Sequence, residues 1–279
     1  MAEDLHGKPD PKAFWKFELT GWQSAVNKYH DSFGGLTSQT IPALLDATEV
    51  SKSSHVLDVA SGPGYVAASA AERGATVVAV DFSAAMVAKA RELFPNIDFR
   101  EGDAEALPFH HDTFDAVVMN FGLLHLGQPE KAIGEAYRVL RRGGRFGFTV
   151  WAKPEQAIGF QIALRAIREK GDMNVPLPQG PPFFRFSDEE ESKKTLEEAA
   201  FTNPVTSTTD MMWELGSPEE LYSALYYGTA RTGGLMRAQS AEALDAIKTE
   251  IEKSAEMYRV QQGTLRIPMS ALVVSAAKS

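Results

Sequence analysis

Residues 55–67, with the sequence HVLDVASGPGYVA, constrain the fold of this chain more than any other stretch. A short apolar run ends in a turn of small residues, and a helical pattern follows. This order is typical of the strand, glycine-rich loop and helix that open a nucleotide-binding βαβ unit. Asp58 places a carboxylate at the end of the strand, where burial is costly unless the group has a partner. The stretch therefore predicts a nucleotide-like ligand and leaves open which one.

Strand and helix patterns alternate in the chain that follows. Ser83 is placed to cap a helix that Pro95 ends, and Pro129 is placed to start another that Gly143 and Gly144 end. Several strands are apolar throughout, as strands covered on both faces are. The expected strands of this part are 55–60, 75–80, 97–100, 114–120 and 145–151. Strands separated by helices in this way predict a parallel sheet with right-handed crossovers.

The N-terminal part predicts a helix over residues 10–33. Apolar side chains recur there at spacings of three and four residues, at Trp15, Leu19, Trp22, Val26 and Tyr29. Such a helix either docks on the body of the domain or acts as a lid whose aromatic face covers a ligand. We expect an N-terminal helical lid over residues 1–48 and a nucleotide-binding core over residues 49–152.

The pattern changes after residue 152. Ser187 and Glu190 predict a capping box that opens a helix ending near Ala200, and Ser217 begins a second capping box. The other expected elements are a helix over 155–170, a proline-aromatic loop at 175–186, a strand over 204–214, helices near 218–230 and 240–258, and a final strand over 267–276. Residues 153–279 are therefore interpreted as the C-terminal part of the sheet, with a helical insertion at about 216–262 between the last two strands.

The composition narrows the function classes. Acidic residues outnumber basic ones by 37 to 28, which gives a net charge of −9 and disfavours nucleic acid as a partner. The chain has no cysteine, which excludes disulfides and thiolate nucleophiles. No apolar run approaches the roughly 18–20 residues that span a bilayer, and no Asp or His cluster has the spacing of metal ligands. We expect a cytoplasmic enzyme with a small-molecule substrate and no metal ion, acting as a monomer or homodimer.

Two ligands compete for the glycine loop. The G-x-G-x-x-A run that starts at Gly62 fits the fingerprint of dinucleotide-binding proteins, with Asp81 at the distance of a ribose ligand. Asp58 instead favours S-adenosylmethionine, because a carboxylate repels a pyrophosphate but attracts the cationic amino group of a methionine moiety. Asp103 and Asn120 add polar side chains at the ends of the third and fourth strands, where α/β sheets bind ligands.

Residues 55–151 resemble a class I S-adenosylmethionine-dependent methyltransferase, more specifically the ubiquinone/menaquinone C-methyltransferase-like (methyltransferase type 11) group. The resemblance rests on the D-x-G-x-G-x-G loop, the acid that ends the second strand, the Gly-Asp-Ala-Glu…Leu-Pro-Phe stretch at 102–109 and the Arg-Val-Leu…Gly-Gly turn at 138–144. It implies a Rossmann-like α/β fold with a seven-stranded, mostly parallel sheet whose last strand is antiparallel. The first glycine of the loop is Ala60 in this chain, and we expect Ala60 to keep a negative φ.

The resemblance implies roles for individual residues. Ala60 and Gly62 would bring the backbone close to the methionine part of the cofactor, and Asp81 would bind the ribose hydroxyls. Asp58 is added because of its charge and Tyr29 because of its place in the helical stripe. The expected contacts with S-adenosylmethionine, and with S-adenosylhomocysteine as its product, are Tyr29, Asp58, Ala60, Gly62, Asp81, Phe82, Met86, Asp103, Ala104, Asn120 and Phe121.

The acceptor is expected to be a hydrophobic small molecule. His125, in the loop after the fourth strand, and His30, after the helical stripe, are the candidate general bases, although His125 could instead pack the loop before Pro129. Aromatic side chains are expected to wall the acceptor pocket, although core packing is the alternative for each. These residues are Trp22, Phe33, Trp151, Phe183, Phe184, Tyr222 and Tyr226. Arg185 or Arg231 could pair with an acidic group of the acceptor.

The favoured function is C- or O-methylation of an aromatic, polyketide, quinoid or terpenoid molecule, as in secondary metabolism. The sequence leaves open the identity of the acceptor, the atom that is methylated and the use of a general base. Two other functions compete with this one. The first is an NAD(P)-dependent oxidoreductase on the same fold, and the second is a non-catalytic protein that retains the S-adenosylmethionine-binding fold.

Overall fold

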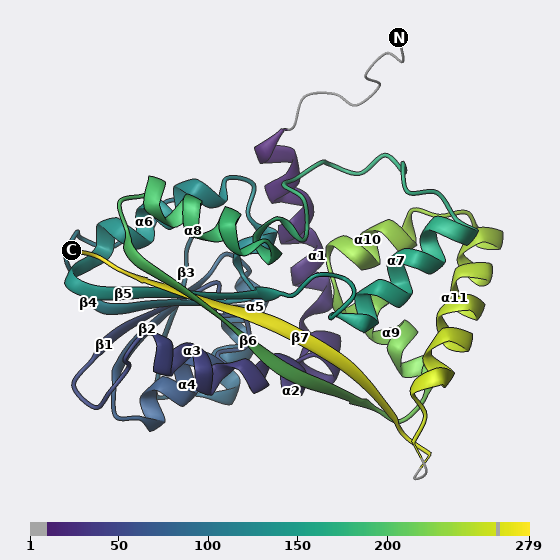
Figure 1. Ribbon diagram of the computed structural model, residues 1–279, viewed down its shortest axis with the longest axis horizontal. Coiled ribbons are helices and arrows are strands. Elements are labelled where there is room, and N and C mark those ends of the chain that lie inside the picture. The colour runs from purple at the N-terminus through teal and green to yellow at the C-terminus, as the bar shows by residue number, and fades with distance from the viewer. Residues whose placement is uncertain (1–9, 261–262) are drawn as a thin grey trace.

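The computed structural model describes residues 10–260 and 263–279 (Figure 1). In these residues seven strands form one sheet in the order β3-β2-β1-β4-β5-β7-β6. The strands are β1 (His55–Val59), β2 (Thr76–Asp81), β3 (Asp98–Glu101), β4 (Phe114–Asn120), β5 (Leu140–Trp151), β6 (Thr202–Leu215) and β7 (Leu265–Ala277). β1 to β5 pair in parallel, whereas β7 runs antiparallel to both of its neighbours, β5 and β6. The predicted mostly parallel sheet with an antiparallel last strand is confirmed.

Helices cover both faces of the sheet (Figure 1). One layer holds α3 (Ile41–Ala47), α4 (Tyr65–Glu72) and α5 (Ala84–Leu93), and the other holds α6 (Pro129–Val139) and α8 (Glu189–Glu198). Because side chains alternate along a strand, Val56 of β1 packs into the first layer and Leu57 into the second. Both are fully buried, and each such burial stabilises the fold by about 1.5–3 kcal/mol. Burial on both faces explains why these strands are apolar throughout.

The predicted helix starts are confirmed at two of three caps. Ser83 accepts a hydrogen bond from Met86 N at the start of α5, and Ser217 accepts one from Glu220 N at the start of α9 (Pro218–Gly228). The third cap was wrong by one residue, because Asp188 and not Ser187 caps α8. The Ser187 hydroxyl is buried and donates to the Trp151 carbonyl at 2.7 Å, so it is not available to the helix.

A second group of helices lies beside the sheet and contains α7 (Ile158–Lys170), α9, α10 (Arg231–Arg237) and α11 (Ala241–Ala255). The last three follow β6 and precede β7, which confirms the predicted helical insertion. The helix expected near 218–230 is α9, which ends at Gly228, and α10 from Arg231 is a further helix that was not predicted. Residues 1–9 of the expected lid and residues 261 and 262 of the expected insertion lie outside the described residues.

The N-terminal helix α1 (Pro11–Ser32) stands between the sheet and this second group of helices (Figure 1). Short α2 (Gly34–Thr37) follows it. The buried face of α1 differs from the predicted stripe, because its most buried residues are Phe14, Glu18 and Ala25. The stripe residues Trp15 and Trp22 are only half-buried, and both line a cavity. Helix α1 is thus covered on one side by other helices and faces a cavity with its aromatic side chains.

Lys278 closes the end of the sheet that lies away from the cavity. Its ammonium group donates to Asp112 Oδ1 at 2.8 Å, to the Tyr137 carbonyl at 2.9 Å and to the Leu140 carbonyl at 2.7 Å. The residue is 9% exposed, so these bonds are shielded from water. Lys278→Met is expected to lower the free energy of unfolding by about 1.5 kcal/mol, because hydrogen bonds to a charged group are lost.

Urea unfolding of the variant measures this loss. The matched control is Lys194→Met, because Lys194 makes an exposed ion pair with Glu198 at 3.8 Å, and such pairs contribute little. Equal midpoints for the two variants would show that the Lys278 bonds contribute no more than a surface pair.

In the described part of the chain, no helix is long and apolar enough to cross a membrane.

Candidate active site

The loop after β1 takes three residues into the left-handed region of φ. Ala60 has φ +54°, Gly62 has φ +51° and Gly64 has φ +89°. The expectation that Ala60 keeps a negative φ was wrong. A non-glycine residue in this region costs roughly 1–2 kcal/mol, and the tight turn imposes it here. The methyl group of Ala60 points toward Gly122, where an added Cβ would lie only 2.6 Å from it.

Asp58 is fully buried beneath this loop. Its Oδ2 accepts a hydrogen bond from Ala67 N of α4 at 3.0 Å, while Oδ1 is buried and has no hydrogen-bond partner within the described residues. Burial raises the pKa of this carboxyl to about 8, the Ala67 N–H opposes the shift and the negative charge of Asp81 adds to it. A buried carboxyl group with an unused oxygen is suited to a cationic ligand group.

Asp81, at the end of β2, holds the glycine loop in place. Its Oδ2 accepts from Gly62 N at 2.8 Å and its Oδ1 from Ser83 N at 2.9 Å. Burial raises the pKa of Asp81 to about 6, and these two backbone N–H groups oppose the shift. Each carboxylate oxygen keeps a second lone pair, so Asp81 can still accept hydrogen bonds from hydroxyl groups of a ligand.

The residues expected around an adenine lie together at the ends of β2 and β3. Phe82 and Met86 line one side of the cavity, and Asp103 and buried Ala104 line its edge. The ring of Trp15 from α1 meets Phe82 edge to face at 6.0 Å between centroids. Nε1 of Trp15 is buried without a hydrogen-bond partner among the described residues, so it is a further unused donor at the cavity wall.

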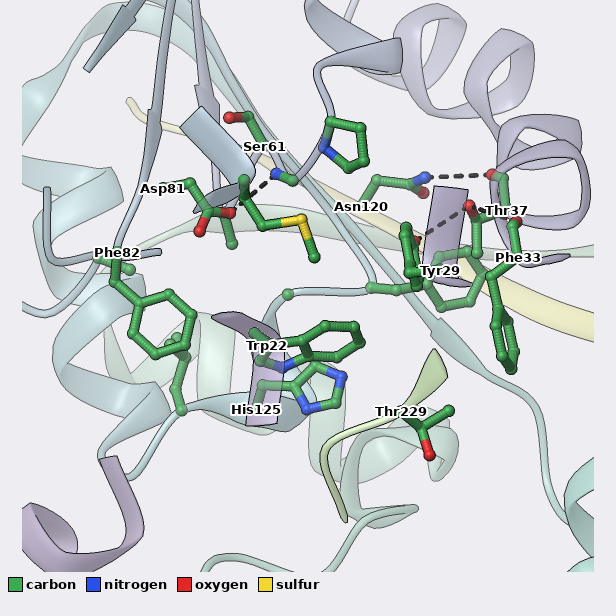
Figure 2. A pocket seen from close by; sticks show the side chains of 18 of the residues that line it. Trp22, Tyr29, Phe33, Thr37, Ser61, Asp81, Phe82, Asn120, His125 and Thr229 are labelled. Carbon is green, nitrogen blue, oxygen red and sulfur yellow. Dashed lines mark hydrogen bonds between the residues drawn. The ribbon is translucent and has the colours of Figure 1, made fainter. Parts of the chain in front are cut away.

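Asn120 and Phe121 end β4 on the other side of the loop. The Asn120 amide donates to the Thr37 carbonyl at 3.1 Å (Figure 2), and its oxygen accepts from Thr40 at 2.8 Å and from Thr149. The polar atoms of Asn120 thus tie α2, the turn that follows α2, and β5 to β4. Phe121 has φ +53°, and its N–H donates to Thr149 Oγ1 at 3.0 Å.

One cavity joins all of these residues (Figure 2). Its empty space, including the solvent at its open mouth, is about 1190 Å³. Its second half is aromatic and receives side chains from α1, β5, α7, the proline loop and the insertion. The lining residues of that half include Trp22, Tyr29, Phe33, Trp151, Phe160, Phe183, Thr229 and Arg231. Burial raises the pKa of Tyr29 to about 12, so its hydroxyl stays neutral and bonds Thr37.

His125 lies at the boundary between the two halves, next to Trp22 (Figure 2). Its Nδ1 is 3.0 Å from Oε2 of Glu18, a fully buried residue of α1. Trp22 Nε1 donates to the same oxygen at 3.1 Å. Glu18 was not among the residues predicted from the sequence. The available signal was a carboxylate four residues after Phe14 and four before Trp22, hence on the same face of the helix as these aromatic residues.

Four of the predicted site residues do not line the cavity. His30 bonds the hydroxyl of Tyr65 and is separated from the cavity by that ring. Tyr222 and Tyr226 stack on each other at 5.5 Å on α9. Lys248 and Arg237 cover their rings, so these tyrosines face other helices instead of the cavity. Phe184 packs against Phe183 from behind.

The other predicted residues are brought together. Every remaining cofactor and pocket candidate lines the cavity, including Trp22, Tyr29, Phe33, Asp58, Ala60, Gly62, Asp81, Phe82, Met86, Asp103, Ala104, Asn120, Phe121, His125, Trp151 and Phe183. Arg231 also lines the cavity, whereas Arg185 is held outside it by Glu130 and Glu191 at 2.5 and 2.6 Å.

The architecture and the loop are those of the class I methyltransferase fold, and the comparisons agree. Residues 57–148 match the methyltransferase domain family. A demethylmenaquinone methyltransferase of Renibacterium salmoninarum is 39% identical over 120 residues, which cover 43% of this chain and 51% of that protein. The ubiquinone/menaquinone biosynthesis C-methyltransferase UbiE of Methylobacterium nodulans is 40% identical over 123 residues, 40% of this chain and 49% of that protein. The chain thus spans about half the length of these curated relatives.

Solved structures share the fold at low identity. A Haemonchus contortus phosphoethanolamine N-methyltransferase bound to S-adenosylhomocysteine is 18% identical, with a TM-score of 0.58 and coverage of 97% of this chain and 61% of that one. The [4+2]-cyclase SpnF is 21% identical, with a TM-score of 0.52 and coverage of 86% and 80%. Residues 57–148 thus carry a methyltransferase domain on this fold. This part of the chain is similar in sequence to the demethylmenaquinone and UbiE methyltransferases.

Proposed function

We propose that this protein transfers the methyl group of S-adenosylmethionine to the carbon or oxygen of a hydrophobic aromatic small molecule. The observation that carries the proposal is the single cavity that runs from the buried carboxyl of Asp58 to the aromatic walls around His125. Its first half is polar and lies over the carboxyl ends of β1 and β2. Its second half offers aromatic rings and the partly buried guanidinium of Arg231, which suits a planar apolar acceptor.

Unused polar atoms support the fit of the cofactor to the first half. Oδ1 of Asp58, Oγ of Ser61 and Nε1 of Trp15 are all buried at this cavity and have no partner among the described residues. Buried polar atoms without partners cost free energy, which a polar ligand recovers. An added Cβ at Gly62 would meet only open space, so the backbone there can approach a ligand closely.

We assign the methionine amino group to Asp58, the ribose hydroxyls to Asp81, and the adenine to the space between Phe82, Met86 and Asp103. When bound, the cofactor supplies an electrophilic methyl carbon whose bond to sulfur breaks as the bond to the acceptor forms. The protein then contributes mainly by positioning the acceptor. It holds the acceptor against the rings of Phe121 and Trp151, whose centroids lie 4.2 Å apart, and it keeps water out. Correct positioning can supply roughly 7–11 kcal/mol at best.

Asp81→Ala is expected to weaken binding of S-adenosylhomocysteine by about 1–3 kcal/mol. The variant removes the acceptor of ribose hydrogen bonds and also releases Gly62 N, so the loop is less well held. Isothermal titration calorimetry with S-adenosylhomocysteine measures the change. The control is Asp98→Ala, because Asp98 is exposed and pairs with Arg100 outside the cavity. Unchanged affinity in Asp81→Ala would place the ribose elsewhere.

A labelled-methyl transfer assay against phenolic, quinoid, polyketide and terpenoid acceptors tests the function itself. Calorimetric titration with NAD is the companion experiment, and binding of NAD alone would favour the oxidoreductase alternative. The same measurements test the second alternative, a non-catalytic protein that retains the S-adenosylmethionine-binding fold. Binding of S-adenosylhomocysteine without transfer to any acceptor class would favour a non-methylating protein.

Most walls of the acceptor half lie outside the matched residues 57–148, so the cavity and not the match supports the acceptor class. α1, Trp151, Phe183 and Arg231 all fall beyond that range. A quinone precursor remains one candidate among aromatic acceptors, by analogy with the names of the relatives. We also propose domain boundaries after residues 48 and 152 and a cytoplasmic location. We further propose that the protein is a monomer or homodimer without a nucleic acid partner.

A further inference from the structure

Glu18 is a carboxylate buried completely beside the acceptor half of the cavity. Its two oxygens have different neighbours. Oε2 accepts from Trp22 Nε1 at 3.1 Å and lies 3.0 Å from His125 Nδ1. Oε1 has no hydrogen-bond partner among the described residues and lies 3.8 Å from Nε of Arg231. Burial of a carboxylate is costly, and a salt bridge or hydrogen bonds to a fixed partner are needed to offset the cost.

We propose that Glu18 positions His125 as the general base that takes the hydroxyl proton of a neutral phenolic or enolic acceptor. The inference rests on the proposed methyl transfer and names the acceptor chemistry for it. An ionised carboxylate only accepts hydrogen bonds, so His125 must donate from Nδ1. In the neutral ring the other nitrogen, Nε2, then carries a lone pair. His125 lines the cavity, so this tautomer gives the acceptor half a base.

Arg231 compensates the charge of Glu18 and helps to hold the loop that carries His125. Its guanidinium donates to the Leu124 carbonyl at 3.0 Å and to the Pro181 carbonyl at 2.9 Å. Burial lowers the pKa of Arg231, and the negative charge of Glu18 opposes that shift. The guanidinium also lies over the Phe183 ring, 5.4 Å from its centroid. Arg231 thus holds the backbone next to His125, and Glu18 holds Nδ1 of its ring.

The chemistry of this arrangement selects the acceptor. The hydroxyl proton passes to Nε2 of His125, and the electron pair left on oxygen, or on the conjugated ring carbon, forms the bond to the methyl carbon while the methyl–sulfur bond breaks. The positive charge that forms on His125 lies against Glu18, and the proton leaves to solvent after product release. An apolar cavity disfavours a ready-made phenolate, so an acceptor of ordinary phenolic acidity enters as the neutral hydroxyl compound.

The first test does not depend on activity. Nitrogen-15 NMR of histidine-labelled protein is expected to show His125 as the Nδ1–H tautomer with an unprotonated Nε2. Glu18→Gln is expected to give a mixture of tautomers, because an amide can either donate or accept. The matched control is Glu135→Gln: Glu135 pairs with Arg138 at 2.7 Å and does not line the cavity. An Nε2–H tautomer in the unaltered protein would overturn the proposal, even if the variants fail to fold.

The second test measures turnover of 1-naphthol and of the more acidic 4-nitro-1-naphthol with S-adenosylmethionine. With 1-naphthol, we expect kcat to fall about 10- to 100-fold in Glu18→Gln and about 10²- to 10⁴-fold in His125→Ala, with unchanged S-adenosylhomocysteine affinity. The double variant should be no slower than His125→Ala. The losses should shrink with the acidic acceptor, which ionises without help. A merely structural role would lower both rates equally.

The outcomes separate this inference from the proposed function. Methyl transfer that proceeds equally in Glu18→Gln and in the unaltered protein would contradict the role of Glu18 and leave the methyltransferase function standing. Absence of transfer to every acceptor class, together with the expected Nδ1–H tautomer, would contradict the proposed function and leave the positioning of His125 by Glu18 standing.

Discussion

Asp58→Asn is expected to stabilise the ligand-free protein at pH 8 and to weaken its binding of S-adenosylhomocysteine about 10- to 100-fold. Burial raises the pKa of Asp58 to about 8 from the ordinary value of 3.8. The folded chain therefore holds a proton between about pH 4 and pH 8 that the unfolded chain has released. Stability must fall as the pH rises through this window, because the folded state binds more protons. One pKa unit corresponds to about 1.4 kcal/mol, so the loss is on the order of several kcal/mol.

Urea unfolding at pH 5, 6.5 and 8 measures this slope. The unaltered protein should lose stability at each step, and Asp58→Asn should lose much less, since the amide does not titrate. Part of the slope remains in both, because burial also raises the pKa of Asp81 to about 6. Asp98→Asn is the control: its carboxyl is paired with Arg100, which lowers its pKa, and it should keep the slope of the unaltered protein above pH 5. Parallel stability curves for Asp58→Asn and the unaltered protein would contradict the assignment.

Cofactor binding should reverse the protonation of Asp58. A cationic amino group beside the carboxyl favours its charged form, so binding at pH 7 should release a proton. Calorimetry in buffers of different ionisation enthalpy detects that release. Asp58→Asn should bind without it. Proton release that persists in the variant would assign it to another group.

Gly122→Ala is expected to lower the free energy of unfolding by about 3 kcal/mol, at the upper end of the range for overpacking, and to abolish cofactor binding. An added Cβ would lie 2.6 Å from the Ala60 Cβ and 2.7 Å from Cγ of Met119, which is buried in the core. The neighbouring backbone at Ala60 and Phe121 is already in the left-handed region, so it cannot shift without disturbing the loop. The change therefore acts on the cofactor loop directly.

The double variant Ala60→Gly/Gly122→Ala decides whether the two residues are complementary. Removal of the Ala60 methyl group relieves one of the two clashes and the strain at φ +54°, so about half of the lost stability should return. Urea midpoints of the unaltered protein, the two single variants and the double variant give the coupling. Purely additive effects would show that Ala60 and Gly122 do not compensate each other.

The fold could be predicted largely because the sequence shows both the apolar runs of the strands and the apolar spacing of three and four residues in the helices. β1 to β5 lie within a few residues of their expected positions, since strands buried on both faces are apolar throughout and helices separate them. The loop between Asp58 and Gly64 was also informative, because a charged residue and glycines that interrupt an apolar stretch have few structural explanations. The error at Ala60 came from the backbone, because a single alanine does not reveal the φ that a turn imposes on it.

The candidate site was harder to predict where it depends on long-range packing. Glu18 and His125 are far apart in the chain, and only the docking of α1 brings them together. Tyr222 and Tyr226 have the same spacing as cavity residues on a helix, but rotation of α9 directs them toward Lys248 and Arg237. Periodicity identifies a face of a helix and does not identify what that face contacts.

The ends of the helical insertion meet in the sheet, where Leu215 of β6 pairs with Leu265 of β7. Paired strands lie about 5 Å apart, so the two ends of the segment between these positions are adjacent in the fold. That segment carries Thr229, Arg231 and Thr232 into the acceptor half of the cavity, while the glycine loop and Asp81 belong to other parts of the chain. Segments whose ends are close together are the ones most readily exchanged between proteins. The part of the acceptor half that the insertion supplies can therefore be exchanged, by evolution or by design, while the glycine loop and Asp81 are kept.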